Sequence, residues 1–301
     1  MPGGREAGMD HDIYTYSPID RRPPFRLPGG ARVAFFILLH LEYRELIPPA
    51  GAYRDPRFRG EFGDFSPEYR TWSYREYGDR IGVFRLLSLF DALGLPVSVA
   101  INAAAAERRP NLIEATRSRG YEPVAHGLSA TQMITSRMSE EEERRHIVDA
   151  RDRLARAWGA TPRGWLGQDY GVTPRTSRLL AEAGFSYTLD WPNDEQPYWH
   201  NPDRSLIAVP SQPDWDDVQT LLLRRAPVHH FPQLVRDALE RLVAETDGAR
   251  VFGVGVHPWM IGAPHRIRYL KEALEAAVGI SGVLPATAGQ IAQWFLEGAS
   301  P

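Results

Sequence analysis

The chain has 301 residues, a formal net charge of −3 and 43% hydrophobic residues. This composition allows one large folded domain and gives no electrostatic reason to expect a nucleic-acid partner. Cysteine is absent, so disulfides and thiolate metal sites are excluded, and any metal must be held by His, Asp or Glu. No apolar run is long enough to span a membrane and the polar N-terminus does not resemble a secretion signal, so we expect a cytoplasmic protein without a membrane partner.

Strand and helix patterns alternate along the chain after an irregular start. Residues 1–30 are rich in Pro, Gly and Arg and predict an irregular N-terminal arm, whereas residues 31–301 predict one barrel domain. The near-continuous apolar run at 31–43 is typical of a strand buried on both faces. Residues 44–80 lack periodicity and predict a long loop, often a functional feature, and an amphipathic helix is expected over 79–94.

The later part of the chain continues this alternation. Further strands are predicted at 95–103, 121–127, 163–169, 186–191, 206–211, 250–258 and from 283. A long polar helix is expected over 139–159, where Ser139 and Glu142 form a capping box and Gly159 ends the helix. Alternating strands and helices predict a parallel sheet, and about seven such units favour a barrel over an open sheet.

Polar side chains collect at the carboxyl ends of the predicted strands, which is the edge where barrel enzymes keep their chemistry. His40 and Glu42 end the first strand and project to the same side, because side chains two residues apart in a strand share a face. His126 ends the third strand and His257 the seventh. A single histidine at a strand end is more often structural than catalytic, but the shared position of these four residues predicts one site.

Other polar residues leave alternatives open. Asp214, Asp216 and Asp217 follow the sixth strand, and they could join the site or form a solvated turn with helix caps. Three further histidines are expected to be exposed rather than functional: His146, His229 and His230.

Several segments, taken in order, resemble the polysaccharide deacetylase superfamily. The resemblance is strongest to its intracellular branch, which includes metal-independent allantoinases and cyclic-imide hydrolases. The segments that carry it span roughly residues 28–297 and include PGGARVAFFILLHLEY, YREYGDRIGVFRLL, GYEPVAHG, RGWLGQDYGVTPRTSRLLAEAGFSYTLDW, VPSQPDWDDV and VHPWMIGAPHRIRYL. The resemblance implies an α/β fold of the distorted (β/α)7 barrel type and the hydrolysis of a non-peptide carbon–nitrogen bond.

The catalytic residues of the superfamily are only partly present. Its deacetylases use an Asp-Asp pair on the first strand, an H-x-x-x-H metal motif and a histidine on the seventh strand as general acid. Here His40 and Glu42 replace the pair, Ala130 replaces the second histidine of the motif, and His257 matches the general acid. The resemblance thus implies His40, Glu42 and His257 as catalytic residues, and Glu42, His126 and His257 as ligands of one divalent ion, with zinc the simplest choice and His40 an alternative third ligand. A metal-free mechanism stays open.

Matched positions also imply contacts with the substrate. These positions are Arg75, Glu76, Tyr77, Trp165, Asp190, Asp194 and Trp199. We expect a hydrolase of a small amide, ureide or cyclic imide that forms a homo-oligomer, either a dimer or a tetramer. The alternatives are an N-deacetylase of a soluble acetylated sugar and a non-catalytic binding protein on the same fold.

Overall fold

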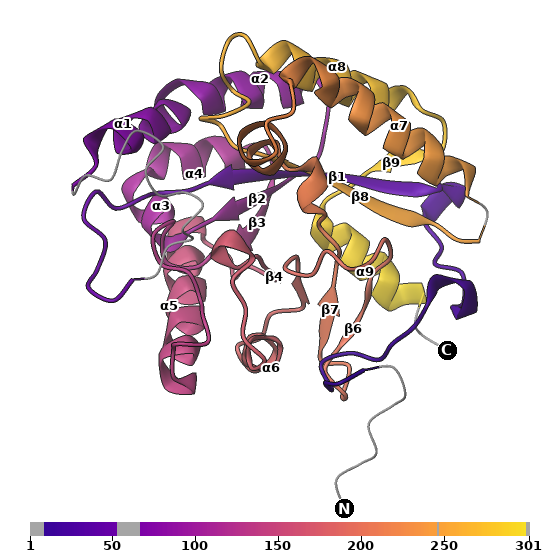
Figure 1. Ribbon diagram of the computed structural model, residues 1–301, viewed down its shortest axis with the longest axis horizontal. Coiled ribbons are helices and arrows are strands. Elements are labelled where there is room, and N and C mark those ends of the chain that lie inside the picture. Colours follow the sequence, from indigo (N-terminus) through magenta and orange to yellow (C-terminus); the bar gives the residue numbers. More distant parts are fainter. Residues whose placement is uncertain (1–8, 53–66, 246, 299–301) are drawn as a thin grey trace, which may run out of the picture.

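In the computed structural model, which describes residues 9–52, 67–245 and 247–298, the strands form one curled sheet (Figure 1). Its order is β6-β7-β5-β4-β3-β2-β1-β8, and β9 pairs with β1 beside β2. The strands are β1 (Val33–Leu41), β2 (Val97–Ile101), β3 (Glu122–Ala125), β4 (Gly164–Trp165), β5 (Tyr187–Thr188), β6 (Tyr198–His200), β7 (Leu206–Ala208), β8 (Arg250–Val256) and β9 (Val283–Pro285). This half-barrel confirms the expected distorted α/β barrel.

One strand departs from the expected parallel sheet. β6 pairs with β7 in the antiparallel direction, whereas the other ladders among the described strands are parallel. The connection between β6 and β7 covers only residues 201–205, with Asn201 and Arg204 in left-handed conformations. A link this short allows only an antiparallel hairpin, because a parallel crossover needs a dozen residues or more.

Helices cover the outer face of the sheet, and one helix lies inside the curl (Figure 1). The helices are α1 (Tyr69–Tyr77), α2 (Val83–Leu93), α3 (Ala103–Arg108), α4 (Pro110–Arg117), α5 (Glu140–Trp158), α6 (Thr176–Glu182), α7 (Phe231–Ala244), α8 (Ile267–Gly279) and α9 (Ala288–Gly298). The inner helix is α9, whose Ile291 and Ala292 pack against inward side chains of the strands. Within the described part of the chain, no helix combines the length and apolarity needed to cross a bilayer.

The alternation of side chains along β1 separates two apolar layers. Odd-numbered residues of Val33–Leu41 pack outward against α2, α7 and α8. The even-numbered residues Ala34, Phe36 and Leu38 point inward, toward α9. His40 continues the inward series at the carboxyl end of the strand, since side chains two residues apart share a face. The fold therefore places a polar layer directly above a dry inner core.

The segment before α2 is more ordered than its sequence predicts. Residues 69–77 are helical, so the loop expected over 44–80 is wrong at this point. The helix expected over 79–94 is confirmed and ends at Gly94, but it does not begin at residue 79, because a π-helical turn at Gly78–Gly82 joins it to α1. The glycines allow close packing, because a Cβ on Gly82 would lie 2.0 Å from the carbonyl oxygen of Pro258. Residues 53–66 of the expected loop lie outside the described residues.

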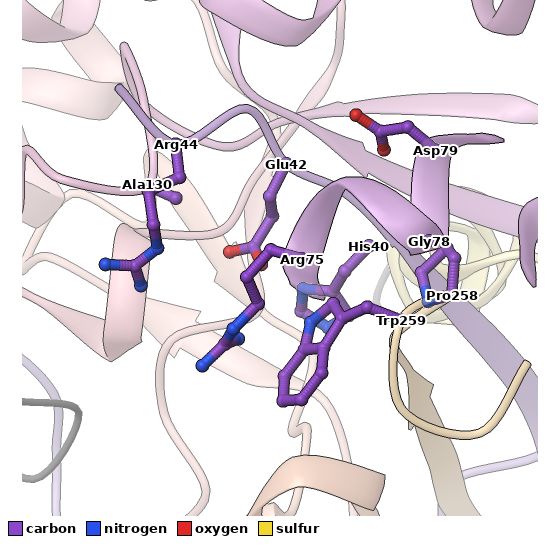
Figure 2. Close-up of a pocket in the computed structure, with 9 residues that line it drawn as sticks. All are labelled: His40, Glu42, Arg44, Arg75, Gly78, Asp79, Ala130, Pro258 and Trp259. Atoms are coloured by element: carbon purple, nitrogen blue, oxygen red, sulfur yellow. The ribbon is translucent and has the colours of Figure 1, made fainter. Parts of the chain in front are cut away.

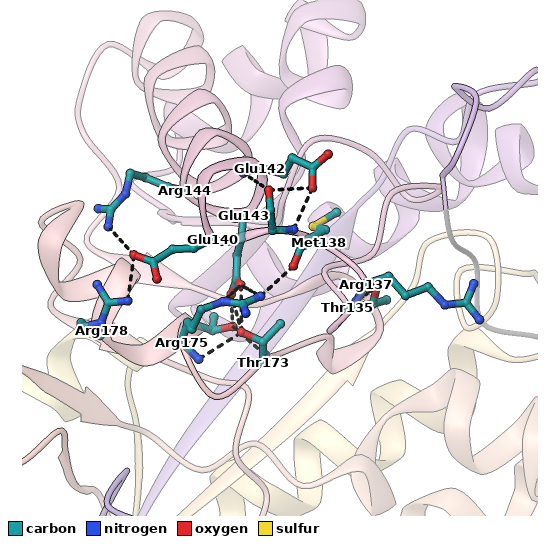
Figure 3. A network of polar contacts seen from close by, with 12 residues as sticks. Thr135, Arg137, Met138, Glu140, Glu142, Glu143, Arg144, Thr173, Arg175 and Arg178 are labelled. Atoms are coloured by element: carbon teal, nitrogen blue, oxygen red, sulfur yellow. Dashed lines mark hydrogen bonds and ion pairs between the residues drawn. The ribbon is translucent and has the colours of Figure 1, made fainter.

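A buried carboxylate ties α5 to the loop before α6 (Figure 3). Glu143 is fully buried, and it accepts hydrogen bonds from Thr173, Thr176 and Arg175. The expected capping box of Ser139 with Glu142 begins α5 directly beside it. A buried charge with several donors is stable only in this paired form, so the network fixes where the chain leaves β4 for α6.

The part of the N-terminal arm that is described, residues 9–30, contains only two short 3-10 turns. It runs along the sheet edge at β6, where the ring of Tyr14 stacks on His200. The boundary between arm and barrel at residue 30 stays a prediction.

Candidate active site

Three histidines and a glutamate meet at the carboxyl edge of the sheet. His40 is the penultimate residue of β1, Glu42 follows this strand, His126 follows β3, and His257 follows β8. The parallel register of β1 with β8 sets His257 beside His40, and their rings stack with centroids 4.0 Å apart and planes 15° apart. The structure therefore brings together the four residues that the strand ends predicted as one site.

Glu42 is held as an anion at the centre of this group. Its Oε1 accepts a hydrogen bond from Gln168 Nε2 at 2.6 Å and lies 3.2 Å from His126 Nε2. Burial raises the pKa of Glu42, but the hydrogen bond from His126 and the charges of His257 and His126 outweigh it and hold the pKa well below its usual value. The carboxylate is therefore ionised across the physiological range.

The ring of His126 has a fixed orientation. Its Nδ1 lies 2.8 Å from the carbonyl oxygen of Leu166, which can only accept, so Nδ1 carries a proton. Nε2 is the nitrogen that faces Glu42: with a proton it donates to the carboxylate, and without one it presents the lone pair that a metal ion would take. A backbone carbonyl that fixes the tautomer of a histidine in this way is typical of metal ligands.

His257 is bound by an aspartate that the sequence left open. Its Nδ1 donates to Asp217 Oδ1 at 2.6 Å, and Asp217 Oδ2 accepts the backbone N–H groups of His257 at 2.9 Å and Ile261 at 3.2 Å. Burial lowers the pKa of His257, but Asp216, Asp217 and Glu42 outweigh it and raise the pKa to about 9. The ring is therefore an imidazolium with its Nε2 proton toward Glu42, 4.0 Å away.

Asp216 and Asp217 belong to the site, whereas Asp214 does not. Asp217 is fully buried and Asp216 is 4% exposed, while Asp214 forms an exposed ion pair with Arg224. Burial, opposed by the charge of His257 but reinforced by Asp217, raises the pKa of Asp216 to about 6. Its carboxylate fits against Gly255, where a Cβ would lie 2.5 Å from Asp216 Oδ2.

His40 is a neutral histidine whose ring nitrogens make no hydrogen bond to the described part of the chain. Among the described residues neither ring nitrogen has a hydrogen-bond partner, although the side chain is buried, and Nε2 lies 3.8 Å from Asp216 Oδ2. Burial and the charges of His257 and His126 lower the pKa of His40 well below its usual value, and Glu42 opposes them only in part. A buried polar atom without a partner costs about 1–3 kcal/mol, so such atoms often mark a functional site.

A small cavity opens above this group (Figure 2). Its volume is about 20 Å³, enough for about one water molecule. Its lining consists of His40, Glu42, Arg44, Arg75, Gly78, Asp79, Ala130, Pro258 and Trp259. Figure 2 shows His40 and Glu42 in the middle of this lining, with Arg75 between Glu42 and Trp259.

Two sets of donors in this group have the spacing of a metal site. The ligand atoms of His40, Glu42 and His126 lie within 4.8 Å of one another, and so do those of His40, Asp216 and His257. The first set agrees with the alternative in which His40 is the third ligand. The set with His257 as third ligand stays a prediction, and Asp217 already holds the Nδ1 of that histidine.

The residues predicted to contact substrate do not form one pocket. Arg75 lines the cavity, with its guanidinium carbon 3.5 Å from the centroid of the Trp259 ring. Its neighbours in sequence do not line it. Glu76 forms an ion pair with Arg109, and the hydroxyl of Tyr77 accepts a hydrogen bond from Arg85.

The two tryptophans predicted as substrate contacts pack in apolar surroundings instead. Trp165 is fully buried on the outward side of β4 and meets the ring of Phe185 edge-on. Trp199 on β6 packs against Phe295 of α9. Neither ring lines the cavity at Glu42, because each belongs to a strand position that faces a helix.

The two predicted aspartates serve the loops next to the site. Asp190 is buried and accepts hydrogen bonds from the backbone N–H of Gly167 at 2.6 Å and from Thr188 Oγ1 at 2.8 Å. Burial outweighs these bonds and raises the pKa of Asp190 to about 6. Asp194 binds Arg22 of the N-terminal arm at 2.6 Å, so it anchors the arm rather than lining the cavity.

The histidines outside the site divide into two kinds. His229 and His230 are exposed, as expected. The expectation that His146 is exposed is wrong, because it is 6% exposed and lies against Gly127, where a Cβ would be 3.1 Å from its Nε2. Burial lowers the pKa of His146 to about 4, although Asp149 opposes this effect. His146 lies on the buried face of the amphipathic helix α5. The four glutamates in the first turn make this face hard to recognise in the sequence.

Residues 76–188 match the polysaccharide deacetylase family. A Schizosaccharomyces pombe protein provisionally named a polysaccharide deacetylase is 27% identical over 240 residues, which cover 72% of this chain and 73% of the relative. The crystal structure of PuuE allantoinase superposes with a TM-score of 0.81 and 28% identity, over 92% of this chain and 95% of that one. A protein from Pseudomonas aeruginosa PAO1, provisionally described as a polysaccharide deacetylase, superposes with a TM-score of 0.80 and 27% identity, over 93% and 96%.

These similarities confirm the family resemblance and the type of barrel seen in the sequence. Deacetylases and allantoinases hydrolyse carbon–nitrogen bonds other than peptide bonds, which is the class of enzyme expected here. The family match contains His126 but ends before His257 and begins after His40 and Glu42. The residues that depart from the deacetylase pattern on β1 therefore lie outside the matched segment.

Proposed function

We propose that this protein hydrolyses a non-peptide carbon–nitrogen bond of a small amide, ureide or cyclic imide. The observation that carries the proposal is the stacked pair of His40 and His257 beside the anionic Glu42. Environment pushes the pKa values of the two histidines in opposite directions, which is how an acid and a base are made from two groups of one kind.

The proton transfers follow from these protonation states. The oxygen of a water molecule adds to the carbonyl carbon, and the neutral ring of His40 takes the proton that this water loses. The carbon–nitrogen bond then breaks, and the leaving nitrogen takes the Nε2 proton of His257. Asp217 holds His257 by Nδ1 and stabilises the imidazolium, so that Nε2 remains the donor.

The same site has the donors for a divalent metal ion, and we propose zinc as the ion that fits it best. Glu42 and His126 would hold the ion, with His40 as third ligand, because His126 presents Nε2 and the His40 nitrogens have no partner among the described residues. When bound, such an ion polarises a carbonyl and lowers the pKa of water. His40 then has one of two roles, ligand or base, and metal analysis decides between them.

The test compares metal content and turnover in the same preparations. Protein purified without a histidine tag, as wild type and His126→Ala, is analysed for bound metal and assayed on a panel of ureides and cyclic imides. Metal at near one equivalent that disappears in His126→Ala shows a metal site at His126, and its loss in His40→Ala as well assigns His40 as a ligand, whereas metal-free protein whose turnover ignores chelators favours His40 as the base. We expect His257→Ala to lose at least a hundredfold in kcat/KM and the exposed control His229→Ala to lose nothing. Turnover unaffected by His257→Ala contradicts the proposed mechanism.

A second candidate is removal of an acetyl group from a soluble sugar. The family match and the name of the S. pombe relative favour it. It needs the same chemistry at a different substrate, so the two candidates are separated by assaying acetylated amino sugars beside the ureides and imides. Turnover of the sugars alone favours the second candidate.

A further inference from the structure

The indole N–H of Trp259 is a buried donor that makes no hydrogen bond to the described part of the chain. Trp259 is 5% exposed, and its Nε1 is without an acceptor there. A buried tryptophan N–H usually finds a hydrogen-bond partner. Trp259 lines the catalytic cavity with His40 and Glu42, and Figure 2 shows its indole nitrogen on the side of the ring toward His40. A donor left unused at this cavity points to a ligand that brings the acceptor.

The turn that carries Trp259 is held on both sides. Trp259 follows His257 by two residues, in the turn after β8. Asp217 anchors this turn by accepting the backbone N–H groups of His257 and Ile261. On the other side, Gly78 packs so closely that a Cβ there would lie 2.6 Å from the backbone nitrogen of Trp259. The rings of His257 and Trp259 have centroids 6.2 Å apart, so one fixed turn positions the proposed acid and the indole together.

The proposed reaction needs a hydrogen-bond donor for the carbonyl oxygen. When the oxygen of water adds to the carbonyl carbon, the double bond becomes single and its electron pair moves to the carbonyl oxygen. Glu42 is an anion and His40 takes the proton of the water, so neither of them stabilises that negative charge. His257 gives its proton to the leaving nitrogen. A donor that is already fixed in place is effective here, because it needs no reorientation as the charge forms.

We propose that the Nε1–H of Trp259 donates to the carbonyl oxygen of the substrate, which makes Trp259 a further catalytic residue. This inference rests on the proposed function. The indole keeps its proton throughout the reaction. Its hydrogen bond strengthens while the oxygen carries negative charge, and it weakens again when the carbon–nitrogen bond breaks and the carbonyl double bond forms once more.

The rival donor is Arg75, whose guanidinium carbon lies 3.5 Å from the centroid of the Trp259 ring. Trp259→Phe separates the two donors, because phenylalanine keeps an aromatic face for Arg75 but has no N–H. On any compound of the panel that the wild type turns over, we expect this variant to lower kcat by about a hundredfold. KM should change by less than about threefold, because the bond gains its strength only in the transition state.

The control is Trp165→Phe, which removes the same kind of donor from a second buried indole. Trp165 Nε1 also has no hydrogen-bond partner among the described residues, but its ring lies on the outward side of β4 and does not line the cavity. This variant should leave kcat and KM unchanged, and the melting temperatures of the two variants report what each loses in packing. A kcat that Trp259→Phe leaves unchanged, or lowers no more than Trp165→Phe does, overturns the inference.

A binding measurement separates this inference from the proposed reaction. The indole N–H signals of protein labelled with nitrogen-15 tryptophan are recorded by NMR while hydantoin, succinimide or acetamide is added. The signals missing from Trp259→Phe and Trp165→Phe assign the two rings. We expect the Trp259 signal to move downfield and the Trp165 signal to stay, because only Trp259 gains an acceptor. Such a shift without turnover of any compound supports the inference even where the proposed hydrolysis fails, whereas a Trp259 signal that none of the three compounds moves downfield overturns it.

Discussion

Replacing Asp217 by asparagine tests whether this residue sets the protonation of His257. The change keeps the shape of the side chain and removes its charge. Asparagine can still accept the backbone N–H groups of His257 and Ile261 through its oxygen. Its NH₂ group then faces His257 Nδ1 and donates to it, so the neutral ring is forced into the opposite tautomer.

The expected fall in the pKa of His257 follows from its contact with Asp217. Asp217 Oδ1 lies 2.6 Å from His257 Nδ1, and two unit charges about 4 Å apart attract by about 4 kcal/mol at an effective dielectric constant of about 20. Since one pKa unit corresponds to about 1.4 kcal/mol, losing this charge lowers the pKa of His257 from about 9 to about 6. At pH 7.5 only about 3% of the ring is then protonated, which predicts at least about a thirtyfold loss in kcat/KM.

The assay is kcat/KM as a function of pH, on whichever compound of the panel the wild type turns over. The acid form of His257 is lost as pH rises through its pKa, so the alkaline limb of the Asp217→Asn profile should move to lower pH. Asp214→Asn is the matched control, because Asp214 lies on the same turn but is exposed and bound to Arg224. A folded Asp217→Asn protein with wild-type kcat/KM and an unmoved alkaline limb would refute the role of Asp217.

Three further predictions concern the stability of the fold. Ser139→Ala removes the cap of α5, where Ser139 Oγ accepts the N–H of Glu142, and should cost about 1 kcal/mol in urea unfolding; a cost near zero contradicts the capping box. Gly82→Ala puts a Cβ 2.0 Å from the Pro258 carbonyl oxygen and should lower the melting temperature, whereas Gly279→Ala meets open space and should be harmless; equal melting temperatures would contradict the close packing. His200 is buried and its pKa is lowered to about 3 by burial and then by His11, so the folded ring stays neutral at pH values where the unfolded ring binds a proton. Its contribution to unfolding free energy should therefore fall by about 1.4 kcal/mol per pH unit as pH drops below about 6.5, seen as the difference between wild type and His200→Asn; an equal slope in both proteins refutes it, and exposed His229→Asn should change nothing.

The sequence predicted the architecture because the parallel strands leave a strong pattern. β1 reads as an unbroken apolar run since both of its faces are buried, and the helices after it carry caps and an apolar stripe. The antiparallel β6 was missed because a strand of three residues is too short to show a periodic pattern of apolar residues. Its pairing with β7 also depends on a hairpin of irregular composition. The helix at 69–77 was missed because its outward residues are aromatic or charged and only Thr71 is buried.

The four strand-end residues of the candidate site were predictable for a geometric reason. Parallel strands end at one edge of a sheet, and alternation fixes the face, so His40, Glu42, His126 and His257 had to converge once each strand was located. Side-chain contacts between elements far apart in the chain, in contrast, could not be predicted from the sequence. Gln168 reaches Glu42 across 126 positions of the chain, and Asp217 reaches His257 across 40, through a turn whose course no local pattern describes.

Position 130 shows how a departure from the superfamily pattern changes the chemistry available to the site. A histidine there would supply the second nitrogen of the H-x-x-x-H metal motif, but Ala130 is 7% exposed and offers only a methyl group to the cavity. Figure 2 shows Arg44 beside Ala130. The site keeps Glu42 and His126 as donors, and the ligand atoms of these two residues and of His40 lie within 4.8 Å of one another, so a third ligand can come from β1 in place of position 130.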